Sequence, residues 1–125
     1  MRLLLDTHVL LWALSTPEAL VPEARRVIED GANEVLVSAA SFWEIAIKAT
    51  AGRLTASDDL LAASAEAGFS GLTIDPADAV RAGALPPLHR DPFDRMLVAQ
   101  AQARSLAIVT RDTRLAAYGV TILPA

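Results

Sequence analysis

The chain has 125 residues and a formal net charge of −4, with 53% hydrophobic residues and no cysteine. This composition excludes a disulfide framework and a thiolate metal site, and it argues against nucleic-acid binding through overall positive charge. The length fits one domain over residues 1–125. The sequence also has no apolar run of about 20 residues and no segment resembling a signal peptide, so we expect a cytoplasmic protein without a membrane span.

The chain begins with a short apolar run. Leu3, Leu4 and Leu5 are typical of a strand that is buried on both faces, and Asp6 follows where that strand should end. Beyond it, helical spacing, prolines at first helical positions and glycines after last ones mark further elements. In chain order, the pattern predicts a strand over 2–5, helices over 7–14 and 22–30, a strand over 35–37 and a helix over 38–51.

The second half of the chain continues the alternation. It predicts a helix over 57–67 capped by Ser57, a strand over 72–74, a helix over 75–82 capped by Asp75, a helix from Asp91 to 105, a strand over 107–109, a helix over 113–118 and a strand over 120–123. Strands that alternate with helices predict an α/β fold, a doubly wound and mainly parallel sheet flanked by helices.

Four acids fall where these elements meet, namely Asp6, Glu44, Asp94 and Asp112. Each has a structural alternative: Glu44 could form a capping box with Ser41 or pair with Lys48, and Asp94 and Asp112 could stabilise helix starts. The structural alternatives become less convincing when the four acids are considered together. The carboxyl ends of parallel strands lie along one edge of the sheet, so the acids should lie close to one another. Two carboxylates about 4 Å apart repel by roughly 4 kcal/mol at an effective dielectric of about 20. A cluster therefore needs a cation or the uptake of protons, and Mg²⁺ or Mn²⁺ suits carboxylate oxygens.

Several segments around these acids carry a family resemblance. They are LLDTHVLLW from Leu4 to Trp12, SFWEIAIK from Ser41 to Lys48, HRDPFDRML from His89 to Leu97, and VTRD from Val109 to Asp112. The chain resembles the PIN-domain ribonucleases, and most closely the VapC toxins of type II toxin–antitoxin pairs. The resemblance implies a PIN-like α/β fold, a Mg²⁺-dependent endoribonuclease that Mn²⁺ could also support, a homodimer and inhibition by a VapB-type antitoxin.

The resemblance also implies roles for individual residues. Asp6, Glu44, Asp94 and Asp112 would be both the catalytic residues and the metal-binding residues, with Asp6 and Asp94 as direct ligands. Thr7 and Thr110 match supporting polar positions, whereas His8 matches only one subgroup.

An RNA backbone would need cations near this acidic site, and Arg90, Arg95 and Arg111 are the candidates, Arg95 first among them. Lys48 and Arg114 are interpreted as solvated surface, and Trp12, Phe42 and Trp43 as core residues rather than base-stacking platforms.

Other α/β classes fit less well. A receiver domain needs a paired acid after the first strand, and a haloacid-type phosphatase needs D-x-D there, but Thr7 and His8 follow Asp6. The remaining alternative is a non-catalytic PIN-fold module that binds RNA or a partner. The complete set of four acids argues against that alternative.

Overall fold

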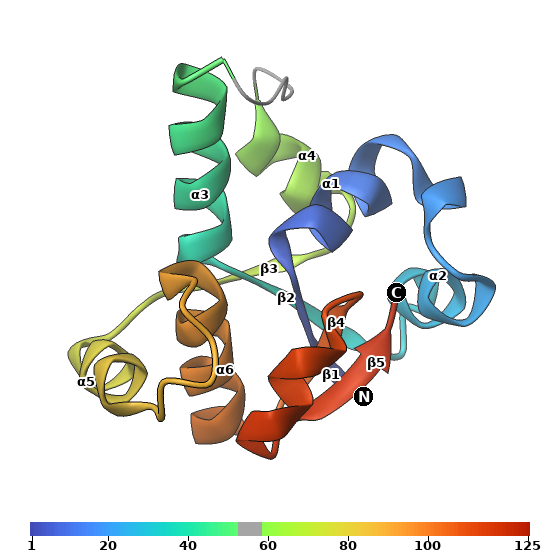
Figure 1. Ribbon diagram of the computed structural model, residues 1–125. Helices are drawn as coiled ribbons and strands as arrows, with labels where there is room; N and C mark the ends of the chain where they lie inside the picture. The colour runs from blue at the N-terminus through green and yellow to red at the C-terminus, as the bar shows by residue number, and fades with distance from the viewer. Residues whose placement is uncertain (53–58) are drawn as a thin grey trace.

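The computed structural model describes residues 1–52 and 59–125, and Figure 1 shows the arrangement of its elements. The first half contains β1 (Arg2–Leu5), α1 (Thr7–Ser15), the 3₁₀ helix η1 (Pro17–Ala19), α2 (Pro22–Glu29), β2 (Glu34–Ser38) and α3 (Ala39–Thr50). The second half contains α4 (Leu60–Glu66), β3 (Ser70–Leu72), α5 (Pro76–Ala84), α6 (Pro92–Arg104), β4 (Ala107–Thr110), the 3₁₀ helix η2 (Thr113–Tyr118) and β5 (Thr121–Pro124). Among the described helices, none is long and apolar enough to cross a bilayer.

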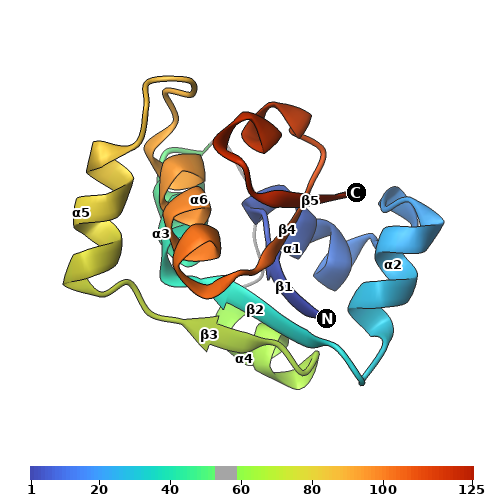
Figure 2. The same cartoon turned by 90° about the horizontal axis from the view of Figure 1, so that it is seen from below.

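The five strands form one parallel sheet in the order β3-β2-β1-β4-β5. Figure 2 shows this sheet as a twisted band with β1 near its middle. From β1 the chain first builds outward to β2 and β3, and later adds β4 and β5 on the other side. The order therefore reverses between β1 and β4, which is where ligands bind in open α/β sheets. The predicted doubly wound α/β fold is confirmed.

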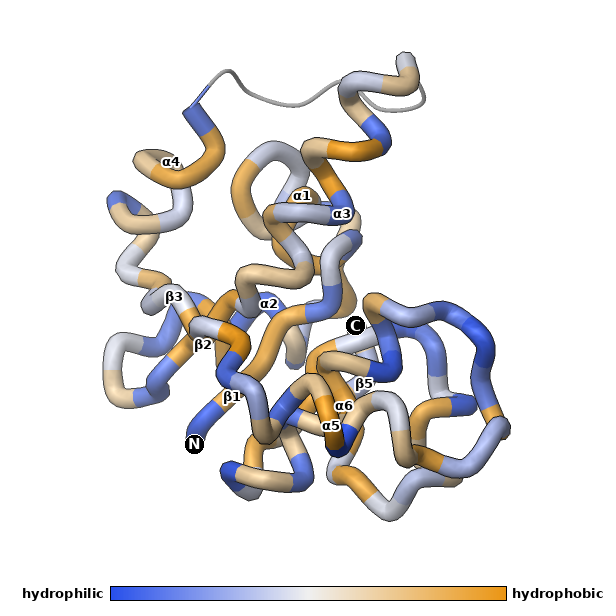
Figure 3. Tube along the Cα trace, turned by 90° about the vertical axis from the view of Figure 1, so that its left-hand side faces the viewer, coloured by the Kyte–Doolittle hydropathy of each residue, from blue (hydrophilic) through white to orange (hydrophobic). Residues whose placement is uncertain are grey.

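Two hydrophobic clusters lie on opposite faces of the sheet. Leu3 and Leu5 point into a cluster with side chains of α1 and α2, whereas Leu4 points into a second cluster with side chains of α6. This alternation follows from the two-residue period of a strand. All three leucines are fully buried, as their unbroken apolar run predicts. Figure 3 shows hydrophobic stretches in the inner strands and hydrophilic ones over the connecting loops.

Most boundaries lie within two residues of the predicted ones. The exceptions are the unpredicted η1 and the start of α4 at Leu60, and the third strand is shifted as a whole. β3 spans Ser70–Leu72 rather than 72–74, because its register is set by pairing with Leu36, Val37 and Ser38 of β2. Asp75 and Asp91 cap α5 and α6 as predicted. The predicted cap Ser57 lies outside the described residues, and Asp59 caps α4.

The helix α3 differs from its prediction in two ways. Ser38 is its N-cap and accepts a hydrogen bond from the backbone N–H of Ala40, so the capping box of Ser41 and Glu44 is not formed. Trp43 was expected in the core but is 62% exposed, and Ile47, one turn further, is 39% exposed. Trp43 and Ile47 are four residues apart and lie on one helix face, and this face points outward. Trp43 packs edge-on against Phe93, with 5.2 Å between ring centroids.

Candidate active site

The acids gather at the carboxyl edge of the sheet, beside the reversal of strand order. Asp6 follows β1 directly and Asp112 follows β4, while Glu44 and Asp94 project from α3 and α6. Together with Asp91 they line one pocket of about 220 Å³, whose other lining residues are His8, Val9, Trp12, Lys48 and Arg111. The structure thus brings together all four acids singled out in the sequence.

Asp6 is held in place from two sides. Its Oδ1 accepts the backbone N–H of His8 at 3.0 Å, which caps α1, and its Oδ2 accepts the hydroxyl of Thr110 at 2.6 Å. The Thr110 hydroxyl oxygen in turn accepts the backbone N–H of Asp112 at 2.9 Å. Thr110 therefore lies beside the pocket and orients two acids. Thr7, the other predicted supporting residue, bonds to Ser41 on α3 at 3.1 Å instead.

The electrostatics of the pocket favour a cation. Burial, together with the negative charges of Asp91, Asp6 and Glu44, raises the pKa of Asp94 to about 7, against the opposing effect of His89. An acid with such a pKa resists ionisation in its surroundings. Carboxylate oxygens are the ligands that hard divalent cations prefer, so this donor set fits Mg²⁺ or Mn²⁺.

Two of the acids have cationic neighbours on their own elements. Lys48 Nζ lies 2.7 Å from Glu44 Oε2, and the side chain of Glu44 is only 7% exposed. Arg114 donates through its side chain to both Oδ atoms of Asp112, at 2.8 Å each, and holds the pKa of that carboxyl well below its usual range. Lys48 and Arg114 had been interpreted as ordinary solvated surface. The side chain of Arg114 is 77% exposed, as that interpretation predicts, but each of the two cations also pairs with an acid of the pocket.

Arg95 does not face the acids with its guanidinium group. Its two terminal nitrogens donate to the Tyr118 hydroxyl and to four backbone carbonyls, those of Ala82, Leu85, Pro86 and His89, at 2.8–3.3 Å. A guanidinium group already satisfied by the protein has little left for a phosphate. Arg95 was the first candidate for an RNA contact, but this arrangement favours a structural role for it instead.

The two other arginines predicted as RNA contacts, Arg111 and Arg90, differ in their surroundings. Arg111 lies at the pocket and stacks over the Trp12 ring, with its guanidinium carbon 4.0 Å from the ring centroid. It also donates to the carbonyl oxygens of Ala19 and Ala125. Arg90 is exposed on the loop before α6.

His89 is a neighbour of the acids that the sequence analysis missed. Its Nε2 lies 3.0 Å from Asp94 Oδ2 and 3.1 Å from Asp112 Oδ2. The only early signal was its place two residues before Asp91, in the segment HRDPFDRML, because a histidine on a loop of uncertain course cannot be assigned a neighbour from spacing alone.

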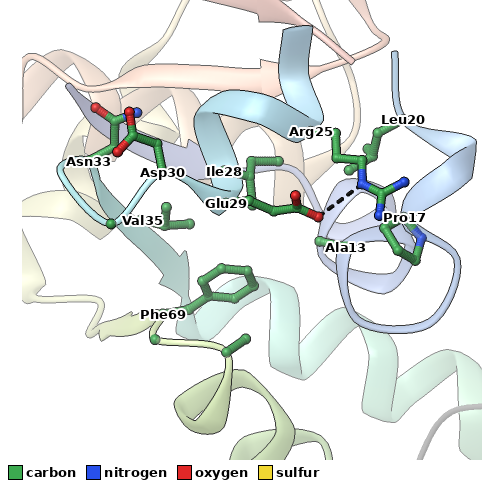
Figure 4. A pocket seen from close by; sticks show the side chains of 13 residues that line it. Ala13, Pro17, Leu20, Arg25, Ile28, Glu29, Asp30, Asn33, Val35 and Phe69 are labelled. Atoms are coloured by element: carbon green, nitrogen blue, oxygen red, sulfur yellow. Dashed lines mark hydrogen bonds and ion pairs between the residues drawn. The ribbon is translucent and has the colours of Figure 1, made fainter. Parts of the chain in front are cut away.

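A second cavity, of about 430 Å³, lies away from these acids, between η1, α2 and the start of β2 (Figure 4). Pro17, Leu20, Ile28 and Phe69 contribute apolar walls to this cavity. Its nearest ion pair joins Arg25 and Glu29 at 2.9 Å and satisfies both groups. The cavity is larger than the acidic pocket but gathers no comparable set of carboxylates, so the acidic pocket is the candidate active site.

Comparisons with known proteins agree with this geometry. Residues 3–120 match the family model of the PIN domain. The chain is 34% identical over 118 residues to Ribonuclease VapC22 from Mycobacterium tuberculosis, which covers 92% of this chain and 90% of that protein.

Among solved structures, the chain is similar to VapBC2 from Rickettsia felis bound to a DNA fragment from its promoter, with a TM-score of 0.70, 12% identity and coverage of 99% and 98%. It is also similar to DNA-bound VapBC from Salmonella typhimurium, with a TM-score of 0.69, 18% identity and the same coverage. At these identities, both structures establish the fold alone.

Proposed function

The chain belongs to the PIN-domain family, and from this premise we propose that residues 1–125 form a single PIN domain that acts as a Mg²⁺-dependent endoribonuclease, the toxin of a VapBC-type pair. Its similarity to a protein named as a ribonuclease supports this proposal. The observation that carries it is the convergence of Asp6, Glu44, Asp94 and Asp112 in one pocket where strand order reverses. Mn²⁺ is expected to substitute for Mg²⁺, since both accept carboxylate oxygens.

We assign each of the four acids a metal-binding role according to its position. A divalent cation bound here would lower the pKa of a water molecule and neutralise charge on the scissile phosphate. Asp6 and Asp94 would hold that cation directly, and the hydrogen bond from Thr110 keeps the carboxylate of Asp6 oriented. Glu44 and Asp112 line the same pocket and would bind the cation partly through water molecules. In-line attack by water breaks the P–O3′ bond and leaves a 5′-phosphate and a 3′-hydroxyl.

An RNA backbone must approach an acidic pocket, so its own charge needs partners at the rim. Lys48 and Arg114 are the cations best placed for this role, because each forms an ion pair with an acid of the pocket. Arg111 lines the pocket, and Arg90 is exposed on the loop before α6. We therefore propose these four residues, rather than Arg95, as contacts for RNA phosphates.

A VapB-type antitoxin is the expected partner, and both proteins would meet in the cytoplasm, where RNA substrates occur. Structures of VapBC complexes with the same fold support this assignment. The resemblance of the sequence to VapC toxins implies that the antitoxin crosses the acidic pocket and blocks it.

A homodimer is also expected from the same resemblance. A candidate patch is formed by the exposed Trp43 and Ile47 of α3 together with the partly buried Phe93 of α6, which Trp43 contacts. Trp43 and Ile47 are four residues apart and thus share a helix face, and large apolar side chains grouped at a surface are typical of protein interfaces. Replacing Trp43 by Ser should convert a dimer to a monomer in size-exclusion chromatography with light scattering.

The decisive experiment is cleavage of a structured RNA pool by the purified protein, free of antitoxin. Reactions contain Mg²⁺, Mn²⁺ or EDTA, and the variants are Asp6→Asn and, as a control, Glu18→Gln, which changes an exposed acid outside the pocket. We expect metal-dependent cleavage that Asp6→Asn abolishes and Glu18→Gln retains. Full activity of Asp6→Asn would refute the assignment of the site. No cleavage by folded wild-type protein with either metal would favour the non-catalytic binding module.

A further inference from the structure

The side chain of His89 bridges two acids of the pocket. Its Nε2 lies 3.0 Å from Oδ2 of Asp94 and 3.1 Å from Oδ2 of Asp112, and the imidazole is only 12% exposed. Asp94 comes from α6 and Asp112 from the loop after β4, so these contacts join two separate elements. A group placed in this way can act either as a metal ligand or as a hydrogen-bond donor.

Only the closeness of the three side chains supports His89 as a metal ligand. The ligand atoms of His89, Asp94 and Asp112 lie within 4.8 Å of one another, close enough to share one metal ion. A histidine that binds a metal through Nε2 carries its proton on Nδ1 and almost always donates it to a carboxylate, carbonyl or water.

The surroundings of Nδ1 favour the second possibility. The backbone N–H of Asp91 points at Nδ1 of His89, with 3.4 Å between the two nitrogens. Nδ1 therefore faces a donor and accepts a hydrogen, which places the imidazole proton on Nε2. An Nε2–H group at 3.0–3.1 Å from two carboxylate oxygens is a shared hydrogen-bond donor, and a protonated nitrogen cannot bind a metal.

The backbone of the loop that carries His89 is tightly fixed. The Tyr118 hydroxyl accepts the N–H of His89 at 2.9 Å and donates to the carbonyl of Pro86 at 2.8 Å. Arg95 donates to the carbonyls of both Pro86 and His89. Arg95 is adjacent to Asp94 on α6, and Tyr118 ends the 3₁₀ helix that Asp112 caps. The loop is thus tied to the same two elements whose acids the imidazole bridges.

On these grounds we propose that His89 is a positioning residue for the metal site, in the Nε2–H tautomer, and that it remains a donor to Asp94 and Asp112 when the pocket holds a divalent cation. The proposal rests on the proposed function, since it assumes that these acids bind a metal. The single N–H group draws two mutually repelling carboxylates to a fixed separation. It binds Oδ2 of each carboxylate, so the metal would bind through the remaining lone pairs of the acids in the pocket.

The tautomer can be measured directly, because the chain contains only two histidines. In ¹⁵N-labelled protein, long-range ¹H–¹⁵N spectra distinguish Nε2–H from Nδ1–H, and His8→Leu identifies the signals of His89. We expect the Nε2–H tautomer in EDTA and again with saturating Mg²⁺. The Nδ1–H tautomer in EDTA, or loss of the Nε2 proton when Mg²⁺ is added, would overturn the proposal and make His89 a ligand.

Metal affinity supplies the second measurement. Isothermal titration with Mg²⁺ should show His89→Leu weakened by about 10- to 100-fold, the usual effect of losing a group that orients ligands. His89→Gln keeps an N–H donor at a similar reach and should recover most of that loss, whereas Glu18→Gln, at an exposed position outside the pocket, should bind like wild type. Equal affinity of His89→Leu and wild type would overturn the proposal, as would a His89→Gln variant as weak as His89→Leu.

These outcomes distinguish failure of the proposed function from failure of the role proposed for His89. If wild-type protein binds no Mg²⁺, the proposed function and the metal-positioning role both fail. If it binds Mg²⁺ but His89 is found as a ligand or without effect, only the role of His89 fails. A loss of thermal stability in His89→Leu with unchanged Mg²⁺ affinity would likewise show a purely structural residue.

Discussion

Thr110 Oγ1 donates a hydrogen bond to Asp6 Oδ2 over 2.6 Å, between residues that are 104 positions apart in the chain. The same oxygen accepts the backbone N–H of Asp112. One buried hydroxyl therefore orients the acid after β1 and the loop that carries the acid after β4. Since these strands are neighbours at the reversal of strand order, the bond fixes the centre of the proposed site.

Thr110→Val should weaken Mg²⁺ binding by about tenfold or more, because valine keeps the shape of threonine but leaves Asp6 free to turn. It should also lower the free energy of unfolding by roughly 1–3 kcal/mol, since a hydrogen bond to a buried carboxylate is lost. Isothermal titration and urea denaturation measure the two effects. The matched control is Thr7→Val, which removes a buried hydroxyl that bonds Ser41. It should lose stability alone, and equal loss of metal affinity in both variants would contradict the role of Thr110.

Asp94→Asn should stabilise the metal-free protein at high pH and abolish cleavage. The pKa of Asp94 is raised in the fold from its ordinary 3.8 to about 7. The folded state thus binds this proton more tightly than the unfolded state, so wild-type stability falls as pH rises between these values. The full difference corresponds to roughly 4 kcal/mol. Because a fifth of the side chain is exposed, we expect roughly 2–4 kcal/mol.

The measurement is the free energy of unfolding of wild type and Asp94→Asn in EDTA from pH 4 to pH 8. The advantage of the variant should be near zero at pH 4 and reach its plateau above pH 7. Added Mg²⁺ should raise the melting temperature of wild type more than that of the variant. Parallel curves at all pH values would show that Asp94 is not desolvated among like charges.

Arg95→Lys should destabilise the fold by roughly 2–4 kcal/mol. Lysine carries the same charge but lacks the planar group that reaches four carbonyl oxygens at once. Because those donors serve the protein itself, the salt dependence of RNA binding should keep its slope. Arg90→Met, at an exposed position on the neighbouring loop, should show the reverse pattern, with a reduced slope and unchanged stability. A reduced slope in Arg95→Lys without loss of stability would restore Arg95 as an RNA contact.

Arg114→Gln should raise the KM for RNA by about three- to tenfold while leaving Mg²⁺ affinity unchanged or tighter. Arg114 is largely exposed and neutralises Asp112, so its removal weakens attraction of phosphate but frees that acid for the cation. Steady-state cleavage kinetics and isothermal titration measure the two quantities. Weaker Mg²⁺ binding in the variant would mean that Arg114 instead helps to hold Asp112 in place for the metal.

The sequence alone was sufficient for the parts that depend on local chemistry. Leucines without a polar break predicted the central strand, and Asp91 before Pro92 predicted a helix cap, because both patterns reflect backbone requirements of a few residues. The meeting of Asp6 and Asp112 followed from a general property of parallel sheets. These inferences needed no knowledge of individual side-chain directions.

Contacts between side chains of different elements could not be predicted from the sequence in this way. Arg95 follows Asp94 directly, yet its long side chain reaches back to the preceding loop, whose course no pattern predicts. His89 lies on that same loop and was missed for the same reason. For Trp43, helical spacing identified a stripe but not which element, if any, covers it. The register of β3 likewise depends on its pairing with β2 rather than on its own residues.

The strand order also determines when the site can exist during synthesis. A nascent chain presents Asp6 early, but β4, Thr110 and Asp112 emerge only about a hundred residues later. At translation rates on the order of 5–20 residues per second, that interval lasts roughly 5–20 s. Throughout it, the emerging chain has at most β1, β2 and β3 of the five strands and no complete acidic pocket. A growing chain of this topology therefore cannot assemble the proposed pocket before β4 and Asp112 have emerged.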